Sequence, residues 1–218
     1  MSTYVLIHGG GDSSWYWHLL APELRGRGHD VVAVDLPSPD PSAGLAEYTD
    51  TVVEAVGDRT DLIVVAHSFG GFTGPLVCDR LPVRLLVLLA GMVPAPGEPP
   101  QDWWGNTSYA RDNDIPGDDE IALFYHDVPP DVAAVALTKG QDDAGGAMEK
   151  PWPLGAWPEV PTRYLLPRDD RFFPAEFQRR VVRERLGITP DEMPGSHCVA
   201  LSRPGELADR LEAYRAEL

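Results

Sequence analysis

The chain has few cysteines, few basic side chains and no long apolar run. Cys78 and Cys198 are too few for a disulfide framework and lack metal-ligand spacing, so we expect reduced thiols in or near the core. No apolar stretch approaches the roughly 20 residues of a membrane-spanning helix. Lysine and arginine (18) are outnumbered by aspartate and glutamate (34), which gives a net charge of −16. This charge argues against nucleic acid or an anionic membrane as a partner.

The 218 residues suffice for one sizeable core and are short for two. The N-terminus has no basic region followed by an apolar segment and a cleavage site, and a core strand is already predicted from Tyr4. We therefore expect an unprocessed, cytoplasmic protein. The sequence carries no signal for its oligomeric state.

Short apolar runs alternate with helical patterns along the chain. Apolar runs of this length favour strands that are covered on both faces. The predicted strands are Tyr4–Ile7, Val31–Val34, Leu62–Val65, Leu85–Leu89, Arg163–Leu166 and a weaker one near Ile188–Met193. Helices are predicted over Leu45–Val56, over Gly70–Arg80 with a kink at Pro75, over Pro174–Leu186, and from Ser202 with Leu207, Leu211, Tyr214 and Leu218 on one face. This alternation predicts an α/β fold with a doubly wound, mostly parallel sheet of about six strands.

Residues 93–161 interrupt this pattern. The segment holds half of the 22 prolines and four of the six tryptophans, and it is too long for an ordinary loop. Its tryptophans either pack the segment onto the sheet edge or line a pocket. An acidic run at Asp112–Gly117 partly resembles a calcium loop, but Pro116 and Leu123 occupy ligand positions, so we predict no metal site.

The sequence Ala66-His67-Ser68-Phe69-Gly70 directly follows a predicted buried strand. A serine between small residues at this point is typical of a nucleophile elbow, the sharp strand-to-helix turn that exposes a catalytic serine. Ala66 departs from the G-x-S-x-G pattern by one methyl group. The alternative is a serine that only caps a helix.

A serine nucleophile needs a base and a carboxylate that orients the base. In this fold they follow in the order Ser, Asp or Glu, His. Asp169 and Asp170 follow the predicted strand Arg163–Leu166, and His197, the last histidine of the chain, precedes the final helix. Both aspartates remain candidates at this point.

The negative charge of a tetrahedral intermediate needs hydrogen-bond donors. One predicted donor is the backbone amide of Phe69, directly after the serine. The glycine run after the first strand supplies the other, and we choose the amide of Gly10. The alternative is that this run only forms a turn.

Over nearly its full length the chain resembles the α/β-hydrolase superfamily, in particular plant methyl-ester esterases, hydroxynitrile lyases and small bacterial esterases. The resemblance rests on the His8-Gly9-Gly10 loop with Trp15-Tyr16-Trp17, the Ala66–Gly71 elbow, Asp170 with the Pro174–Gln178 segment, and Gly195-Ser196-His197. It implies a Ser68–His197–Asp170 triad, because the acid of this group lies four residues before the proline. It also implies a cap at residues 93–161, inserted between core segments 1–92 and 162–218 of a single domain.

The chain departs from some members of this group. Hydroxynitrile lyases carry threonine and lysine where this chain has Gly9 and Cys198, so cyanohydrin cleavage is not expected. Ser68 excludes the aspartate-nucleophile mechanism of epoxide hydrolases.

We therefore expect a serine hydrolase that cleaves a small, largely apolar carboxylic ester through an acyl-enzyme and needs no cofactor. Two alternatives stay open: a lyase or cyclisation step with the same triad, and a hydrolase-like ligand-binding protein. The expected pocket residues are the aromatic side chains of the cap and one histidine: Trp103, Trp104, Phe124, Tyr125, His126, Trp152 and Trp157.

Overall fold

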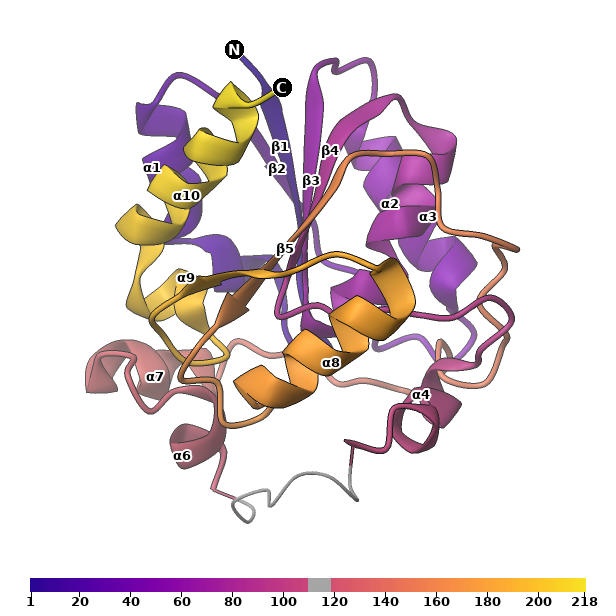
Figure 1. The fold of residues 1–218 in the computed structure, drawn as a ribbon. Helices are drawn as coiled ribbons and strands as arrows, with labels where there is room; N and C mark the ends of the chain where they lie inside the picture. The colour runs from indigo at the N-terminus through magenta and orange to yellow at the C-terminus, as the bar shows by residue number, and fades with distance from the viewer. Residues whose placement is uncertain (110–118) are drawn as a thin grey trace.

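A six-stranded, all-parallel sheet forms the centre of the computed structural model, which describes residues 1–109 and 119–218 (Figure 1). The strand order is β2-β1-β3-β4-β5-β6. The bounds are β1 (Thr3–Ile7), β2 (Asp30–Ala33), β3 (Leu62–His67), β4 (Val83–Leu89), β5 (Thr162–Pro167) and β6 (Asp191–Met193). The predicted α/β fold class and number of strands are confirmed. The run Asp112–Gly117 lies outside the described residues.

Helices cover both faces of the sheet, as the near-continuous apolar strands require. One face packs against α1 (Leu20–Gly26), α9 (Val199–Ser202) and α10 (Pro204–Ala216). The other face packs against α2 (Leu45–Val56), α3 (Gly74–Arg80) and α8 (Ala175–Leu186). Alternate residues of each strand belong to the two apolar clusters, with Tyr4 and Leu6 on one side of β1 and Val5 and Ile7 on the other.

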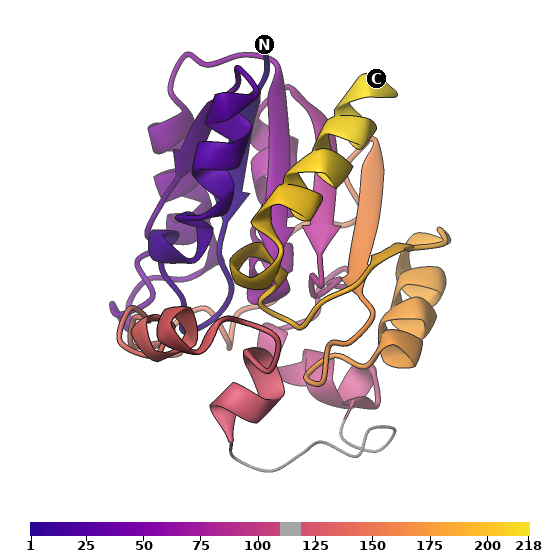
Figure 2. The same cartoon turned by 90° about the vertical axis from the view of Figure 1, so that its left-hand side faces the viewer.

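The described helices between β4 and β5 lie at the carboxyl end of the sheet, opposite the two chain termini (Figures 1 and 2), and the chain then returns to the start of β5. These helices are α4 (Pro100–Asn106), α6 (Glu120–Phe124) and α7 (Pro130–Ala136). Ligands of open α/β sheets bind at this end of the strands. The two short 3-10 helices η1 (Ser14–Trp17) and η2 (Ser68–Phe72) also follow strand ends, η1 after β1 and η2 directly after β3.

Two sequence predictions about helices are wrong. The predicted helix over Gly70–Arg80 is divided into η2 and α3, and Pro75 lies in the first turn of α3 rather than at a kink. The missing N–H of proline costs nothing there, because the first amides of a helix have no partner within it. Leu218 was predicted on the apolar face of the last helix, but it follows the end of α10 and is 45% exposed.

Candidate active site

The turn after β3 holds Ser68 in a strained backbone conformation. Its φ is +50°, in the left-handed region that non-glycine residues rarely adopt. The amide of Met92, beyond β4, donates to the Ser68 carbonyl at 2.8 Å and helps to hold the turn. A Cβ atom on Gly70 would lie 2.7 Å from the carbonyl oxygen of His8, so glycine is required where the turn passes close to the end of β1. This is the geometry of a nucleophile elbow.

Ala66, which departs from the usual elbow pattern, is accommodated by a glycine elsewhere. Ala66 is fully buried at the end of β3. A Cβ atom on Gly74 would lie only 2.8 Å from the Ala66 Cβ. The extra methyl group therefore fits because residue 74 has no side chain.

His197 and Asp170 form a buried hydrogen-bonded pair. His197 Nδ1 lies 2.7 Å from Asp170 Oδ2. The other carboxylate oxygen, Oδ1, accepts hydrogen bonds from the amides of Phe172 and Phe173 at 2.9 and 2.8 Å. Since the carboxylate also accepts from these two amides, it is the acceptor in the pair with His197, and the shared proton lies on His197 Nδ1.

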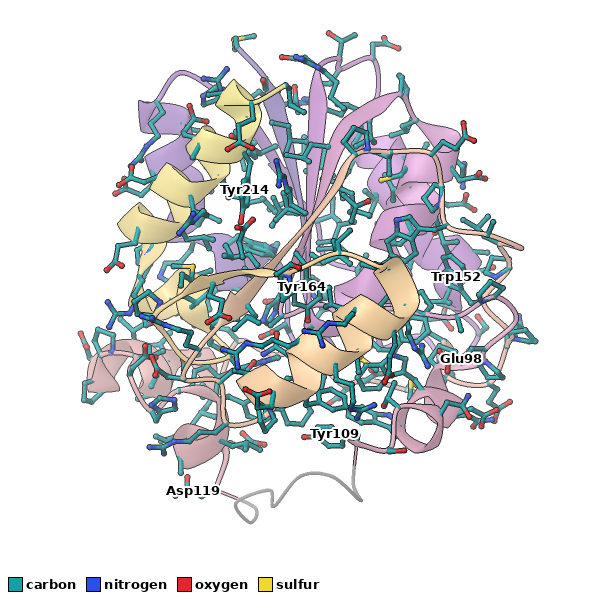
Figure 3. The ribbon with its side chains drawn as sticks, viewed as in Figure 1. Glu98, Tyr109, Asp119, Trp152, Tyr164 and Tyr214 are labelled. Carbon is teal, nitrogen blue, oxygen red and sulfur yellow. The ribbon has the colours of Figure 1, made fainter. Side chains whose placement is uncertain are left out.

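Two buried side chains support Asp170 from the side of α8. Gln178 Nε2 lies 3.4 Å from Asp170 Oδ2, and Tyr164 OH lies 3.1 Å from Gln178 Oε1. The single proton of Tyr164 OH can be donated either to Gln178 Oε1 or to the Gly91 carbonyl, which lies 3.0 Å away, and Figure 3 labels Tyr164 on β5, near α8. The sequence analysis missed both roles, although Gln178 stands in the segment that carried the family resemblance.

Asp169, the other candidate acid, points elsewhere. Its Oδ2 accepts from the Gly195 amide at 2.9 Å, and its backbone carbonyl accepts from His126 Nε2 at 2.8 Å. Asp169 therefore ties the loop before His197 to β5, and Asp170 is the aspartate that contacts the imidazole.

His8 fixes the start of the glycine loop. Its Nδ1 donates to the Gly9 carbonyl at 2.8 Å, and its Nε2 accepts from the Leu36 amide at 3.1 Å. These two contacts require the neutral ring, and burial lowers the pKa of His8 accordingly.

The glycine loop packs directly on the elbow. A Cβ atom on Gly9 would lie 3.0 Å from Ser68 Cβ, and one on Gly10 would lie 3.6 Å from Phe69 Cβ. Among the described residues, the amides of Gly10 and Phe69 have no hydrogen-bond acceptor outside regular helices and strands. Phe69 is also the second residue of η2, where an amide has no partner inside the helix. Two neighbouring N–H groups are therefore free beside Ser68.

His67 braces the loop that carries His197. Its Nε2 donates to the His197 carbonyl at 3.0 Å, and its ring stacks on Tyr16 with the centroids 4.5 Å apart. Burial holds the pKa of His67 well below the ordinary value, so this ring is neutral and structural.

A cavity of about 320 Å³ lies over the elbow. Ser68 and His197 both line it, and the rings of Phe172 and Phe124 approach the His197 ring edge-on at 5.2 and 5.6 Å. The cavity therefore joins the serine, the imidazole and the free amides in one space. The other lining residues are Gly10, Gly11, Asp12, His67, Phe69, Met92, Trp104, Glu120, Tyr125, Asp143, Met148 and Cys198.

The expected pocket residues divide into two groups. Trp104, Phe124 and Tyr125 line the cavity. The others lie away from it: Trp103 and Trp152 are fully buried in the core, Trp157 packs against the core, and His126 bonds to Asp169. Of the four tryptophans in residues 93–161, Trp104 thus lines the cavity and the other three pack in or against the core. The sequence analysis missed Asp12, Glu120 and Asp143, because no motif marks them.

No metal site is evident within residues 1–109 and 119–218, where no cluster of three His, Cys, Asp or Glu side chains has the arrangement of metal ligands. The same residues include no helix that is long and apolar enough to cross a membrane. Both cysteines are free thiols, Cys78 half-buried and Cys198 buried.

Comparison with curated proteins finds esterases and a synthase. Over 252 aligned residues the chain is 24% identical to norfluorocurarine synthase 1 of a Strychnos species, with 96% of this chain and 93% of that protein covered. It is 27% identical to the probable esterase PIR7A of Oryza sativa subsp. indica, with 95% and 94% covered.

Solved structures share the fold. Polyneuridine aldehyde esterase superposes with a TM-score of 0.82 at 22% identity, covering 98% of this chain and 99% of that one. An extracellular alpha/beta-hydrolase from a Paenibacillus species superposes with a TM-score of 0.80 at 20% identity, covering 98% of each chain. The family model described as "Alpha/beta hydrolase family" matches residues 4–210. The elbow, the parallel sheet and this match agree, and the chain belongs to the alpha/beta hydrolase family.

Proposed function

We propose that this protein is a carboxylic-ester hydrolase that uses Ser68 as its nucleophile, His197 as its base and Asp170 to orient the base. The observation that carries the proposal is the 2.7 Å contact between His197 Nδ1 and Asp170 Oδ2, beside a cavity shared with Ser68. The esterase names of several relatives agree with it.

The proposed reaction follows from the tautomer of His197. Because Nδ1–H is bonded to Asp170, Nε2 is the free base that takes the proton of Ser68 as its Oγ attacks the ester carbonyl. His197 then gives this proton to the leaving alcohol, and an acyl group remains on Ser68. A water molecule, deprotonated by the same Nε2, attacks the acyl carbonyl and releases the acid.

The amides of Gly10 and Phe69 are the proposed oxyanion hole. Both belong to residues that meet at the elbow, and hydrogen bonds to an oxyanion strengthen as its charge develops. Each such donor is worth roughly 10²–10³ in rate.

Residues 93–161 are the proposed cap, inserted between core segments 1–92 and 162–218. The cap residues Trp104, Phe124, Tyr125 and Met148 line the cavity and give it an apolar wall. A cavity of about 320 Å³ suits a small ester, so the proposed substrate is a small molecule with a largely apolar body.

Turnover of p-nitrophenyl esters from acetate to octanoate tests the proposal. We expect activity with the short members, a loss of at least about 10³-fold in Ser68→Ala, and no loss in the exposed control Ser42→Ala. A phosphonate ester inhibitor should add one phosphonyl group to the peptide that contains Ser68. Absence of turnover across the series, or turnover that survives Ser68→Ala, contradicts the proposal.

A second candidate keeps the same residues for a lyase or cyclisation step. It is favoured by the synthase name of one relative. Product analysis separates the two, because hydrolysis releases an acid and an alcohol and incorporates one oxygen atom from labelled water.

A further inference from the structure

Three carboxyl side chains line the proposed ester cavity, and no mechanism described above uses them. Asp12 follows the glycine loop, Glu120 opens α6, and Asp143 lies between α7 and β5. Among the described residues that line the cavity there is no lysine or arginine. The negative charge is therefore not neutralised within the described wall.

Asp12 is the most buried of the three carboxyl groups, since Glu120 and Asp143 are exposed. It is half-buried, and within the described chain its side chain makes no hydrogen bond or ion pair. Burial raises the pKa of Asp12 to about 7, and the nearby His197 opposes this rise. Since buried polar groups in proteins are almost always paired, a carboxyl group left open toward a cavity points to a partner that enters the cavity.

Asp143 adds charge near the glycine loop. Its Oδ1 accepts from the Gly145 amide at 2.9 Å, while its Oδ2 would lie 3.7 Å from a Cβ on Gly10. One carboxylate oxygen is thus fixed by its own loop and the other faces the cavity wall. Asp12 and Asp143 therefore act on the same space from different segments.

The remaining wall is rich in aromatic rings. Trp104 and Phe172 meet edge-on with centroids 5.9 Å apart, and Phe124 lies 4.8 Å from Phe172. Aromatic faces attract cations, and quaternary ammonium groups are often bound this way. Carboxylates beside aromatic faces form a site suited to an organic cation, and the same carboxylates repel anions.

We propose that the ester accepted by this site carries an organic cation, a protonated amine or a quaternary ammonium group, and that Asp12 is the residue that recognises it. The inference rests on the proposed ester hydrolysis and adds the substrate class. Asp143 assists from the cavity wall, and esters with a free carboxylate are poor substrates.

Two pairs of esters with equal shape and different charge test this inference. Butyrylcholine and 3,3-dimethylbutyl butyrate place the charge or its neutral replacement on the alcohol side. Methyl 4-(trimethylammonio)butanoate and methyl 5,5-dimethylhexanoate place it on the acyl side. In the wild type at pH 8, we expect kcat/KM of the cationic member of at least one pair to exceed that of its neutral partner by tenfold or more.

Variants locate the effect. Asp12→Asn should lower this cationic-to-neutral ratio at least tenfold, because it removes the charge and keeps the shape. Asp142→Asn, an exposed aspartate next to Asp143 that does not line the cavity, should leave the ratio unchanged. A ratio near one in the wild type for both pairs, or a ratio that Asp12→Asn does not change, overturns the inference.

Failure of the inference can be told from failure of the proposed function. If p-nitrophenyl butyrate is cleaved in a Ser68-dependent way but neither cationic ester is favoured, only the inference is overturned. If no ester is cleaved, calorimetric binding of the two butyrates to Ser68→Ala decides. If butyrylcholine binds at least tenfold more tightly than 3,3-dimethylbutyl butyrate and Asp12→Asn removes this difference, the cation site is supported without hydrolysis. Equal or unmeasurable affinities overturn the inference.

Discussion

The side chain of Asp170 uses its two oxygens for different purposes. Oδ1 is held by the amides of Phe172 and Phe173, and Oδ2 is left for His197. The backbone thus fixes the position of the carboxylate before the imidazole binds to it. This arrangement makes the proposed role of Asp170 sensitive to a change of one atom.

Asp170→Asn is expected to lower kcat by about 10⁴-fold with little change in fold, because an asparagine NH₂ facing His197 makes Nδ1 the acceptor. The proton of the imidazole then lies on Nε2, and this nitrogen can no longer accept the proton of Ser68. Rates with p-nitrophenyl butyrate and circular dichroism of both proteins check this prediction.

Asp169→Asn is the matched control, one residue away and with the same charge change. The Asp169 side chain accepts from the Gly195 amide, which an asparagine oxygen can also do, so we expect a loss of less than about tenfold. Equal losses in the two variants would contradict the assignment of Asp170.

At the scale of elements, η2 packs so closely on the chain beyond β4 that Gly71 has no room for a side chain. A Cβ atom on Gly71 would lie 2.0 Å from the Met92 carbonyl oxygen, a backbone atom that cannot move alone. Gly71→Ala is therefore expected to lower the free energy of unfolding by about 3 kcal/mol and to displace Ser68. In Gly105→Ala, a helical position with open space around it, we expect a gain of about 0.5 kcal/mol. Urea unfolding measures both, and similar effects would contradict the argument.

A buried ion pair joins the segment after β4 to α8. Arg185 donates to both carboxylate oxygens of Glu98, which also accepts from Asn106 Nδ2 at 2.9 Å, and Figure 3 shows Glu98 beside α4. Removing the cation alone leaves the Glu98 carboxylate, which is only 4% exposed, without a counterion. Arg185→Leu should therefore lower the free energy of unfolding by about 3–5 kcal/mol. The double variant with Glu98→Gln should recover part of this loss.

The same pair has a defined pH dependence. Burial raises the pKa of Glu98, but the hydrogen bonds from Arg185 and Asn106 outweigh it and hold the pKa below its ordinary value. A depressed pKa stabilises the fold above the unfolded-state pKa, and this stability is lost as the pH falls through the folded-state pKa. We expect the difference in melting temperature between wild type and the double variant to shrink below about pH 4. A difference that does not change with pH would contradict this account.

Elements whose residues carry a local signal were predictable from the sequence. The apolar runs predicted the first five strands, since a strand buried on both faces is mostly apolar, whereas β6 (Asp191–Met193) contains two acidic residues and gave only a weak signal. The helix Leu45–Val56 has the predicted bounds. The role of Pro75 was predicted wrongly because a proline in the first turn of a helix and one at a kink give the same sequence pattern, and the sequence carries no sign that α3 begins at Gly74, after the separate 3-10 helix η2.

The candidate triad residues could be predicted from the sequence because their order along the chain is characteristic of the fold. Ser68, Asp170 and His197 follow a fixed order, and the structure brings them to one end of the sheet. The cavity wall was not predictable in the same way, because no spacing distinguishes Trp104, which lines it, from Trp103, which is buried in the core. The sequence did not indicate that Asp12 lines the cavity, since the position of Asp12 depends on the conformation of the glycine loop before it.

At the scale of the whole molecule, the cavity lies in a strongly negative field. The net charge is −16, and the described cavity wall adds carboxylates without a lysine or arginine. A field of this sign concentrates cations at the surface and repels anions, independently of any single contact. Whole-molecule charge and the local proposal for Asp12 therefore favour the same class of ester.

Salt separates the long-range field from the local contact. Raising KCl from 20 to 300 mM shortens the Debye length from about 20 Å to about 6 Å, so kcat/KM for butyrylcholine should fall about three- to tenfold. The rate with 3,3-dimethylbutyl butyrate should stay within about 1.5-fold, because a neutral ester has no charge to screen. Asp12→Asn should lower kcat/KM for butyrylcholine because it removes the local contact. It changes the net charge of the protein by only one, so most of the dependence of kcat/KM on salt should remain. Equal salt slopes for the charged and the neutral ester would show that the acidic surface does not act on the substrate.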